Sequence, residues 1–205
     1  QAQALKAENK NWRVLDINGN AYGGVEPPPA VSSMTLTTTN NVGETISLLI
    51  SASEADKADV WIDLNNNGTK DPGESDILFD SDKDYTLGAQ TITIYGKVTD
   101  LDCSDNSLTA LDVSHNAALQ QLECYVNSLS TLDVTKNTAL TYLDCGYNLL
   151  PTLDVTKNTV LEELLCDENS LTELDVTNNT ELLFIVCHAN QIEGDKMETL
   201  VNSLF

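Results

Sequence analysis

The sequence has little positive charge. It contains 10 lysines and arginines against 32 aspartates and glutamates, which gives its 205 residues a formal net charge of −22. Binding to nucleic-acid phosphates or to an anionic lipid surface is therefore disfavoured, because every approach would be repulsive. The sequence also has no run of about 18 apolar residues, so no transmembrane segment is expected.

Motifs of catalysis are missing as well. The sequence contains no HExxH, GxSxG or P-loop pattern. Cys187 and His188 are adjacent, but alternation along a strand would point them to opposite faces, which excludes a catalytic dyad. Carboxylates are plentiful, but a glycosidase needs two of them held across a cleft in different environments, and no motif here indicates such a pair. We therefore expect a protein that is not an enzyme.

Aromatic residues are only 5% of the chain, but hydrophobic residues make up 41%. This apolar fraction argues against intrinsic disorder, and the length is sufficient for a hydrophobic core.

An internal repeat supplies the residues of this core. Cysteines recur every 21 residues, at Cys103, Cys124, Cys145, Cys166 and Cys187. Asparagines follow in the same phase, at Asn106, Asn127, Asn148, Asn169 and Asn190.

Each repeat follows the pattern LxxLxCxxNxL, and the first four continue with an LDV stretch and a further asparagine. This is the leucine-rich repeat template, in which stacked coils share a leucine core. We predict a mainly β fold with minor α structure: a right-handed leucine-rich repeat solenoid of 21-residue repeats. The cysteines would point inward as free thiols, with disulfides or soft-metal capture as alternatives. The asparagines would satisfy backbone groups of neighbouring coils.

The pattern LxxLxCxxNxL followed by LDVTKNTAL resembles the cysteine-ladder leucine-rich repeats of internalin J-like bacterial surface proteins. The resemblance covers residues 98–192. It implies a secreted or cell-surface protein of the adhesin type that binds another macromolecule with the concave face of its solenoid. Residues 1–10 lack the apolar core of a signal peptide, so an exported protein would already have lost that segment.

Three parts are expected along the chain. Residues 1–30 form an amino-terminal arm with a proline linker. Residues 31–96 predict a small β-sandwich-like module that also caps the solenoid, with strands at 34–38, 45–51, 60–64, 77–79 and 90–95. Residues 97–205 form the solenoid. A helix over 195–205 closes it, with Asp195 capping its amino end and an apolar side made of Met197, Leu200, Val201 and Leu204.

One motif before the repeats points to a metal. Residues 63–74 fit the calcium-loop pattern D-x-[DN]-x-[DN]-G-x5-E, with candidate ligands at Asp63, Asn65, Asn67, Asp71 and Glu74. The strand expected before this loop and the Pro-Gly pair inside it differ from an EF-hand. A hairpin turn held by Asx hydrogen bonds is therefore the alternative. Calcium is the one candidate cofactor.

Strand alternation also predicts which side chains face outward from the concave strands. They mix carboxylates with aromatic rings, which is typical of protein-binding surfaces. The candidate partner-binding residues are Glu123, Tyr125, Tyr142, Asp144, Leu165, Asp167, Phe184, Val186 and His188. For the apolar residues of the last coil, burial under the capping helix is the alternative.

The opposite flank carries one aspartate per coil, at Asp112, Asp133, Asp154 and Asp175. Each is expected to accept local hydrogen bonds, for example from Thr135 or Thr156.

Two functions remain open. The first is a secreted or cell-surface recognition module, monomeric, that binds an extracellular protein or matrix ligand through the concave face. The second is a structural or presenting region, or a calcium- or glycan-binding accessory module, of a larger secreted protein. The negative charge favours basic or cation-bridged partners in either case.

Overall fold

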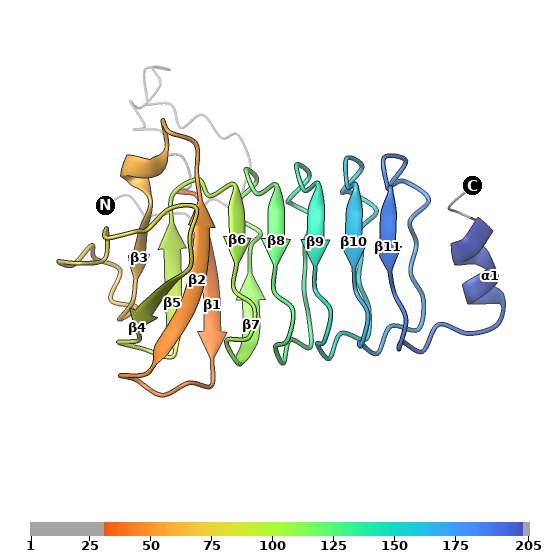
Figure 1. Ribbon diagram of the computed structural model, residues 1–205, viewed down its shortest axis with the longest axis horizontal. Coiled ribbons are helices and arrows are strands. Elements are labelled where there is room, and N and C mark those ends of the chain that lie inside the picture. The colour runs from red at the N-terminus through yellow and green to blue at the C-terminus, as the bar shows by residue number, and fades with distance from the viewer. Residues whose placement is uncertain (1–30, 203–205) are drawn as a thin grey trace, which may run out of the picture. The chain divides into compact units, whose positions relative to one another are not determined.

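The computed structural model describes residues 31–202 (Figure 1). Contacts divide the chain into Gln1–Val31 and a compact unit that begins at Ser32. The expected arm at residues 1–30 and the expected contact of Leu204 lie outside the described residues. Among residues 31–202, no helix has the length and apolar character needed to cross a membrane.

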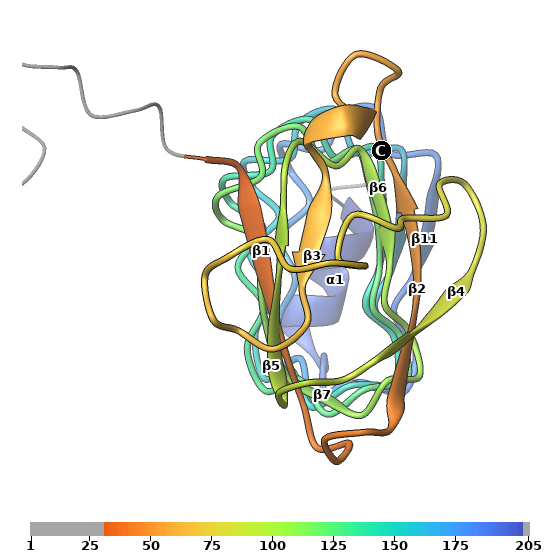
Figure 2. The ribbon, with the colours of Figure 1, turned by 90° about the vertical axis from the view of Figure 1, so that its left-hand side faces the viewer.

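The compact unit contains two β-sheets. One has the strand order β3-β5-β1-β7, and the other has the order β11-β10-β9-β8-β6-β2-β4. Figure 2 looks along the stack of coils and shows the two sheets as opposite walls. The strands are β1 (Ser33–Thr38), β2 (Thr45–Ser51), β3 (Trp61–Asp63), β4 (Lys83–Thr86), β5 (Thr91–Tyr95), β6 (Asp100–Asp102), β7 (Leu108–Asp112), β8 (Gln121–Glu123), β9 (Tyr142–Asp144), β10 (Glu163–Leu165) and β11 (Phe184–Val186). A 3₁₀ turn, η1 (Lys57–Asp59), precedes β3, and one helix, α1 (Asp195–Asn202), follows β11.

The repeat forms a β-solenoid of about four turns. Strands β6, β8, β9, β10 and β11 pair in parallel, and each leucine at a strand centre pairs with its equivalent 21 residues later, as Leu101 does with Leu122. Leu122, Leu143 and Leu164 have no exposed surface. Because each coil cannot bury its own apolar edge, stacking in register is what creates the core.

The cysteines form the expected inward column of free thiols, with one exception. All five are unpaired, and Cys103, Cys124, Cys145 and Cys166 are fully buried. Burial raises the pKa of each thiol, so these sulfurs behave as small apolar groups. Cys187 is only partly buried. The prediction of full burial was wrong there because no further coil covers the last one in the described chain.

The segment before the repeats shares both sheets with the solenoid. Strand β2 pairs antiparallel with β6, placing Ile50 opposite Leu101. Strand β1 pairs antiparallel with β7, placing Leu36 opposite Leu111. One continuous core therefore runs from Met34 to Leu200.

One local expectation was wrong. Residues 77–79 form no strand, and only Phe79 makes an isolated bridge, to Ile50. The strand lies later, at β4, where Tyr85 is buried opposite Ile46. The reason is that burial of this aromatic side chain, rather than the short apolar run before it, selects the segment that pairs with β2.

The terminal helix is less covered than expected. It begins at Asp195, so this carboxylate lies in the first turn instead of preceding it as a cap. Leu200 is buried, but Met197 and Val201 are 39% and 46% exposed. Figure 1 shows α1 standing beyond β11 at the end of the stack. Among the described side chains of α1, Leu200 is therefore the one buried against the last coil, and the rest of the predicted apolar side within residues 195–202 stays exposed.

Candidate functional site: the outward face of the parallel strands

The outward side chains of β6 and β8–β11 form one continuous surface, named the strand face from here on. Its central row is Asp102, Glu123, Asp144, Leu165 and Val186. The row before it is Asp100, Gln121, Tyr142, Glu163 and Phe184. The row at the strand ends is Ser104, Tyr125, Gly146, Asp167 and His188. Neighbours within a row are about 4.8 Å apart, one strand spacing. All nine predicted partner-binding residues therefore lie on this face.

The aromatic rings and carboxylates of the strand face differ in how exposed they are. Tyr125 is 38% exposed and Phe184 is 51% exposed. Tyr142 and Leu165 are partly buried, and Asp167 is 8% exposed. Burial of Phe184 under the terminal helix, the alternative weighed from the sequence, is therefore not what the structure shows.

The carboxylates of the strand face repel one another. Burial raises the pKa of Glu123, and the charges of Asp102 and Asp144 raise it further. Burial also raises the pKa of Asp144, where the Gly146 backbone N–H opposes the shift and Asp167 adds to it. Burial raises the pKa of Tyr142 to about 12, and the Asp144 charge adds to this shift.

No lysine or arginine lies in the three rows, and their one histidine, His188, has its Nε2 atom 3.9 Å from the Asp167 carboxylate. Four of the seven lysines in the described residues precede the solenoid. Lys136 and Lys157 lie in turns that follow LDV stretches, and Lys196 is on α1. The strand face is therefore a negative surface with aromatic positions.

Two of its carboxylates are held in place by the backbone. Asp102 accepts a hydrogen bond from the Ser104 N–H at 2.9 Å, and Asp144 accepts one from the Gly146 N–H at 3.0 Å. Each keeps its second oxygen for other partners. Such fixed acceptors lose little side-chain entropy when they bind a donor.

A hollow of about 350 Å³ adjoins the first two solenoid strands. Its lining residues are Leu49, Ser51, Asp80, Asp100, Leu101, Asp102, Gln121 and Glu123. The Asp80 carboxylate is 3.3 Å from the Lys57 ammonium, and its pKa is lowered by hydrogen bonds from Ser51 and Lys57. Strand β2 and the segment after Phe79 thus form one border of the strand face.

The opposite flank carries the predicted aspartate column. The Asp133 and Asp154 carboxylates each accept a backbone N–H and a hydroxyl from the threonine two residues later, at 2.6–2.9 Å. Asp175 does the same with Thr177. These hydrogen bonds, the hydroxyl first, lower the pKa of each aspartate. The prediction of local hydrogen bonding is confirmed, and it gives this column a structural role.

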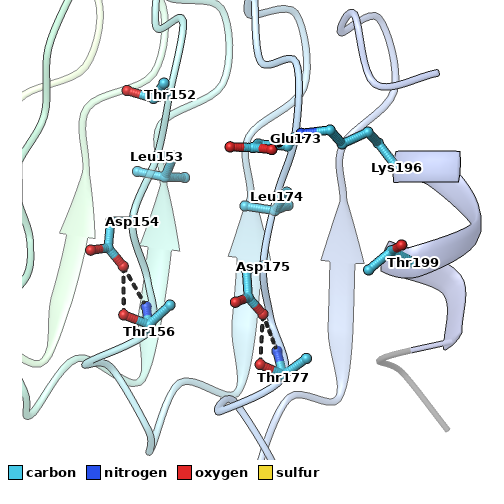
Figure 3. Close-up of a pocket in the computed structure, with 10 residues that line it drawn as sticks. All are labelled: Thr152, Leu153, Asp154, Thr156, Glu173, Leu174, Asp175, Thr177, Lys196 and Thr199. Atoms are coloured by element: carbon cyan, nitrogen blue, oxygen red, sulfur yellow. Dashed lines mark hydrogen bonds and ion pairs between the residues drawn. The ribbon is translucent and has the colours of Figure 1, made fainter.

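A second hollow, of about 580 Å³, lies between this flank and α1. Figure 3 shows the Lys196 ammonium reaching the Glu173 carboxylate across its upper part. The lining residues are Thr152, Leu153, Asp154, Thr156, Glu173, Leu174, Asp175, Thr177, Lys196 and Thr199. Its carboxylates Asp154 and Asp175 already accept two hydrogen bonds each, and Glu173 is paired. The carboxylates that line the hollow therefore already take part in local hydrogen bonds or in an ion pair.

The calcium-loop motif is a closed hydrogen-bonded turn. Asp63 accepts hydrogen bonds from the N–H groups of Asn67 and Gly68, at 3.0 and 2.7 Å. Glu74 accepts from the N–H groups of Leu64 and Asp71, at 2.9 and 2.8 Å. Among residues 31–202, no group of three or more His, Cys, Asp or Glu side chains is placed to hold a metal ion.

The remaining candidate ligands also bond within the turn. The side-chain amides of Asn65 and Asn67 donate to the Asp71 carboxylate at 2.8 and 2.7 Å, and this lowers the pKa of Asp71. The Asx-turn alternative thus describes the hydrogen bonding of this segment. Gly68, at φ +73°, occupies the left-handed position that the bend requires.

Gly146 interrupts the row of side chains at the strand ends. A Cβ at this position would lie 3.0 Å from Asp167 Oδ1 and 3.4 Å from Asp144 Oδ1. Gly146 stands where the coil before has Tyr125 and the coil after has Asp167. This break in the row is visible in the sequence, but the direction of the two carboxylates is not.

The stacked leucines, asparagines and parallel strands define a mainly β solenoid consistent with leucine-rich repeats. No protein-family model matches the chain, and no curated protein matches it. Among solved structures, a match is the functional domain of InlJ from Listeria monocytogenes, which includes a cysteine ladder. The two are 38% identical, with a TM-score of 0.42. The match covers 44% of this chain and 25% of that chain, so it spans about a quarter of that structure's length.

Proposed function

We propose that the chain is a non-enzymatic recognition module of a secreted or cell-surface protein, adhesin-like, which binds an extracellular protein or matrix partner through the strand face. The observation that carries the proposal is that three aromatic rings, Tyr125, Tyr142 and Phe184, lie on the strand face among carboxylates. No lysine or arginine in the three rows neutralises these carboxylates. Rings supply contact area at low entropic cost, and carboxylates supply orientation and selectivity.

The right-handed coil and the 21-residue repeat give the proposed site its shape. In a leucine-rich repeat solenoid the parallel strands form the inner, concave surface, and single residues of each coil contribute to one extended contact area. We further propose that the segment before the repeats acts as the amino-terminal cap. The pairing of β2 with β6 supports this, because it covers the first coil.

The first test replaces Tyr125, Tyr142 and Phe184 together with alanine. Each truncation of a binding ring typically costs more than about 1 kcal/mol, so the triple variant should lose at least about 90% of binding. The measurement is adhesion of beads coated with the full chain to extracellular matrix and to cell monolayers. A control variant, Val42→Ala with Val160→Ala, removes apolar side chains that are 63% and 41% exposed away from the strand face.

Equal adhesion of the triple variant and the wild-type protein would reject the strand face as the binding surface. The second function, a structural or presenting region, would then be favoured. Deletion of residues 98–205 is a poorer test, because it would remove β7 from β1 and β6 from β2 and so disrupt both sheets.

We also propose a calcium site in the turn formed by residues 63–74. Asp63 and Glu74 are 1% and 5% exposed, and neither forms an ion pair within residues 31–202. Buried negative charge favours a cation, and five oxygen-bearing side chains around one bend suit calcium. Rotation of the Asn65 and Asn67 amides would present their oxygens to it.

Titration calorimetry with millimolar Ca²⁺ tests this site. We expect heat from the wild-type chain, and none from Asp63→Asn combined with Glu74→Gln. The matched control is Asp76→Asn with Glu54→Gln, which removes equal charge from exposed positions near the loop. Absence of heat from the wild-type chain would leave the turn with a structural role only.

A further inference from the structure

A row of exposed residues borders the strand face, in the turns that directly follow the parallel strands. It consists of Asp105, Val126, Tyr147, Glu168 and Ala189, one from each coil, and is named the rim row from here on. The backbone N–H of each of the first four donates to a carbonyl of the next coil, at 2.9–3.1 Å. Figure 1 shows these turns side by side along one edge of the stack. Neighbours in the rim row are therefore one strand spacing apart, about 4.8 Å.

The second and third positions of the rim row are apolar and open to solvent. Val126 is 41% exposed and Tyr147 is 53% exposed. Two further exposed apolar side chains, Tyr125 and Leu149, lie within two residues of the row along the chain. Large apolar side chains that are exposed together on neighbouring coils are typical of a contact surface.

The backbone conformation of the rim row does not favour these side chains. All five residues have a positive φ, between +50° and +52°. Asparagine and aspartate are the non-glycine residues best tolerated in this left-handed region, and a β-branched valine is an outlier there. Neither local stability nor burial accounts for Val126, and strain of this kind is typical of binding sites.

Carboxylates flank the apolar pair within the same row. Asp105 lies one coil before Val126, and Glu168 lies one coil after Tyr147, both exposed. Within residues 31–202, neither carboxylate forms an ion pair. The row therefore presents an acidic, an apolar, an apolar and an acidic side chain in turn, over three strand spacings or about 14 Å.

We propose that the rim row binds an extended segment of a protein partner with the pattern basic-x-apolar-x-basic. In an extended chain, side chains on one face are about 7 Å apart, so two steps cover about 14 Å. The two basic side chains then lie against Asp105 and Glu168, and the apolar one lies between Val126 and Tyr147. Charge complementarity fixes this register. The proposal rests on the function proposed above and names the chemistry of its partner.

A fluorescein-labelled peptide, GSRTLTRSG, tests the pattern when it is titrated with the full chain in about 0.15 M NaCl and followed by fluorescence anisotropy. The matched peptide GSTRLRTSG has the same composition, but its arginines neighbour the leucine and point to the other face of an extended chain. We expect the first peptide to bind about fivefold more tightly, the effect of two exposed ion pairs. Equal binding of the two peptides, or no binding of either, would overturn the proposal.

Val126→Asn combined with Tyr147→Asn removes the apolar pair without a change of charge. We expect about tenfold weaker binding of GSRTLTRSG. The melting temperature should not fall below that of the wild-type chain, because asparagine is tolerated at positive φ, whereas a purely structural role would lower it. The control, Val160→Asn with Leu183→Asn, changes two exposed apolar side chains that precede β10 and β11, and should bind within about twofold of wild type.

A second pair of variants separates ion pairing from net charge. Asp105→Asn with Glu168→Gln should abolish the preference for GSRTLTRSG over GSTRLRTSG. Glu162→Gln with Glu181→Gln removes the same charge from exposed positions before the strands and should keep the preference. The proposal is wrong if the two variants behave alike. It is also wrong if sedimentation shows a wild-type dimer that the Val126 and Tyr147 variant abolishes, because a second copy would then occupy the rim row.

The rim row and the strand face can fail separately. If the Val126 and Tyr147 variant adheres to matrix normally while the Tyr125, Tyr142 and Phe184 triple variant does not, the recognition function stands and the rim proposal is wrong. If the rim variant loses the peptide while the triple variant still adheres to matrix, the rim row binds the proposed segment but the strand face is not the adhesive surface.

Discussion

At the scale of single residues, buried asparagine joins one coil to the next. Asn148 Oδ1 accepts the Leu129 N–H at 2.9 Å, and its amide donates to the carbonyls of Cys124, Cys145 and Gly146. Asn127, Asn169 and Asn190 repeat this arrangement. The predicted structural role of these asparagines is confirmed. They satisfy the backbone where each strand bends, which leucine could not do.

We expect Asn148→Ala to lower the free energy of unfolding by about 3 kcal/mol. The change leaves the Leu129 N–H buried without a partner, which costs about 1–3 kcal/mol, and it removes one of the two side-chain hydrogen bonds that the Cys124 carbonyl accepts, the other coming from Asn127. Urea denaturation followed by circular dichroism measures the loss. Asn178→Ala is the control, because Asn178 is exposed and donates one hydrogen bond, to the Thr156 carbonyl at 3.2 Å. Similar losses for the two variants would contradict the assignment.

In a second column of asparagines, the side-chain amide forms hydrogen bonds but the side-chain oxygen does not. The Asn137 and Asn158 amides donate to carbonyls of the preceding coil at 2.8–3.0 Å. Their Oδ1 atoms are buried without a hydrogen-bond partner in the described structure. The sequence predicts the position of this column, but it does not show that only the donor side is used.

At the scale of the elements, the pKa values of the carboxylates shift in opposite directions on the two flanks of the solenoid. On the LDV flank, hydrogen bonds lower the aspartate pKa values, so these groups add stability above their unfolded pKa. That stability is lost as pH falls through the folded pKa. On the strand face the pKa of Asp144 is raised. Its ionisation therefore opposes folding, and stability falls as pH rises through the folded pKa.

Asp144→Asn should consequently raise the melting temperature at pH 7, by about 2 °C, and raise it less at pH 3.5. Asparagine keeps an acceptor for the Gly146 N–H. Asp154→Asn removes the same charge from the other flank and should lower the melting temperature at pH 7, because the pKa of Asp154 is lowered. Thermal scans at both pH values compare them. A shift of the same sign for both variants at pH 7 would show that net charge alone determines the effect.

At the scale of the whole described unit, the segment before the repeats and the solenoid are joined by two strand pairings and one core. Trp61 of β3 stacks on Tyr95 of β5 with ring centroids 4.4 Å apart, and Figure 1 shows these two strands at the end of the unit opposite to β10 and β11. Because both sheets run through the junction, local unfolding of either part would expose the other part's core. We therefore expect cooperative unfolding of the two parts.

A Trp12→Phe variant tests this, since it leaves Trp61 as the only tryptophan. Trp61 fluorescence and the reactivity of the buried thiols toward a pulse of thiol reagent are measured across a urea series. We expect the two transitions to share one midpoint. A fluorescence transition that finishes while Cys145 and Cys166 remain protected would show that the two parts unfold separately.

The solenoid could be predicted from the sequence, because a period of 21 residues forces equivalent leucines, cysteines and asparagines into columns once strands pair in parallel. The outward-facing side chains could be predicted as well, through the alternation along each strand. These features depend on local pattern alone. The degree to which each column is covered could not be predicted, because it depends on what packs against the last coil, as the partly buried Cys187 and the exposed Phe184 show.

Tertiary contacts also placed β4 at Lys83–Thr86 and joined residues 32–96 to the solenoid through both sheets. They turned the Asp144 and Asp167 carboxylates toward one point above Gly146. The physical reason is that such features arise between coils, or between segments far apart in the chain. Packing density and the pairing of backbone groups select among side-chain directions that the sequence leaves equivalent.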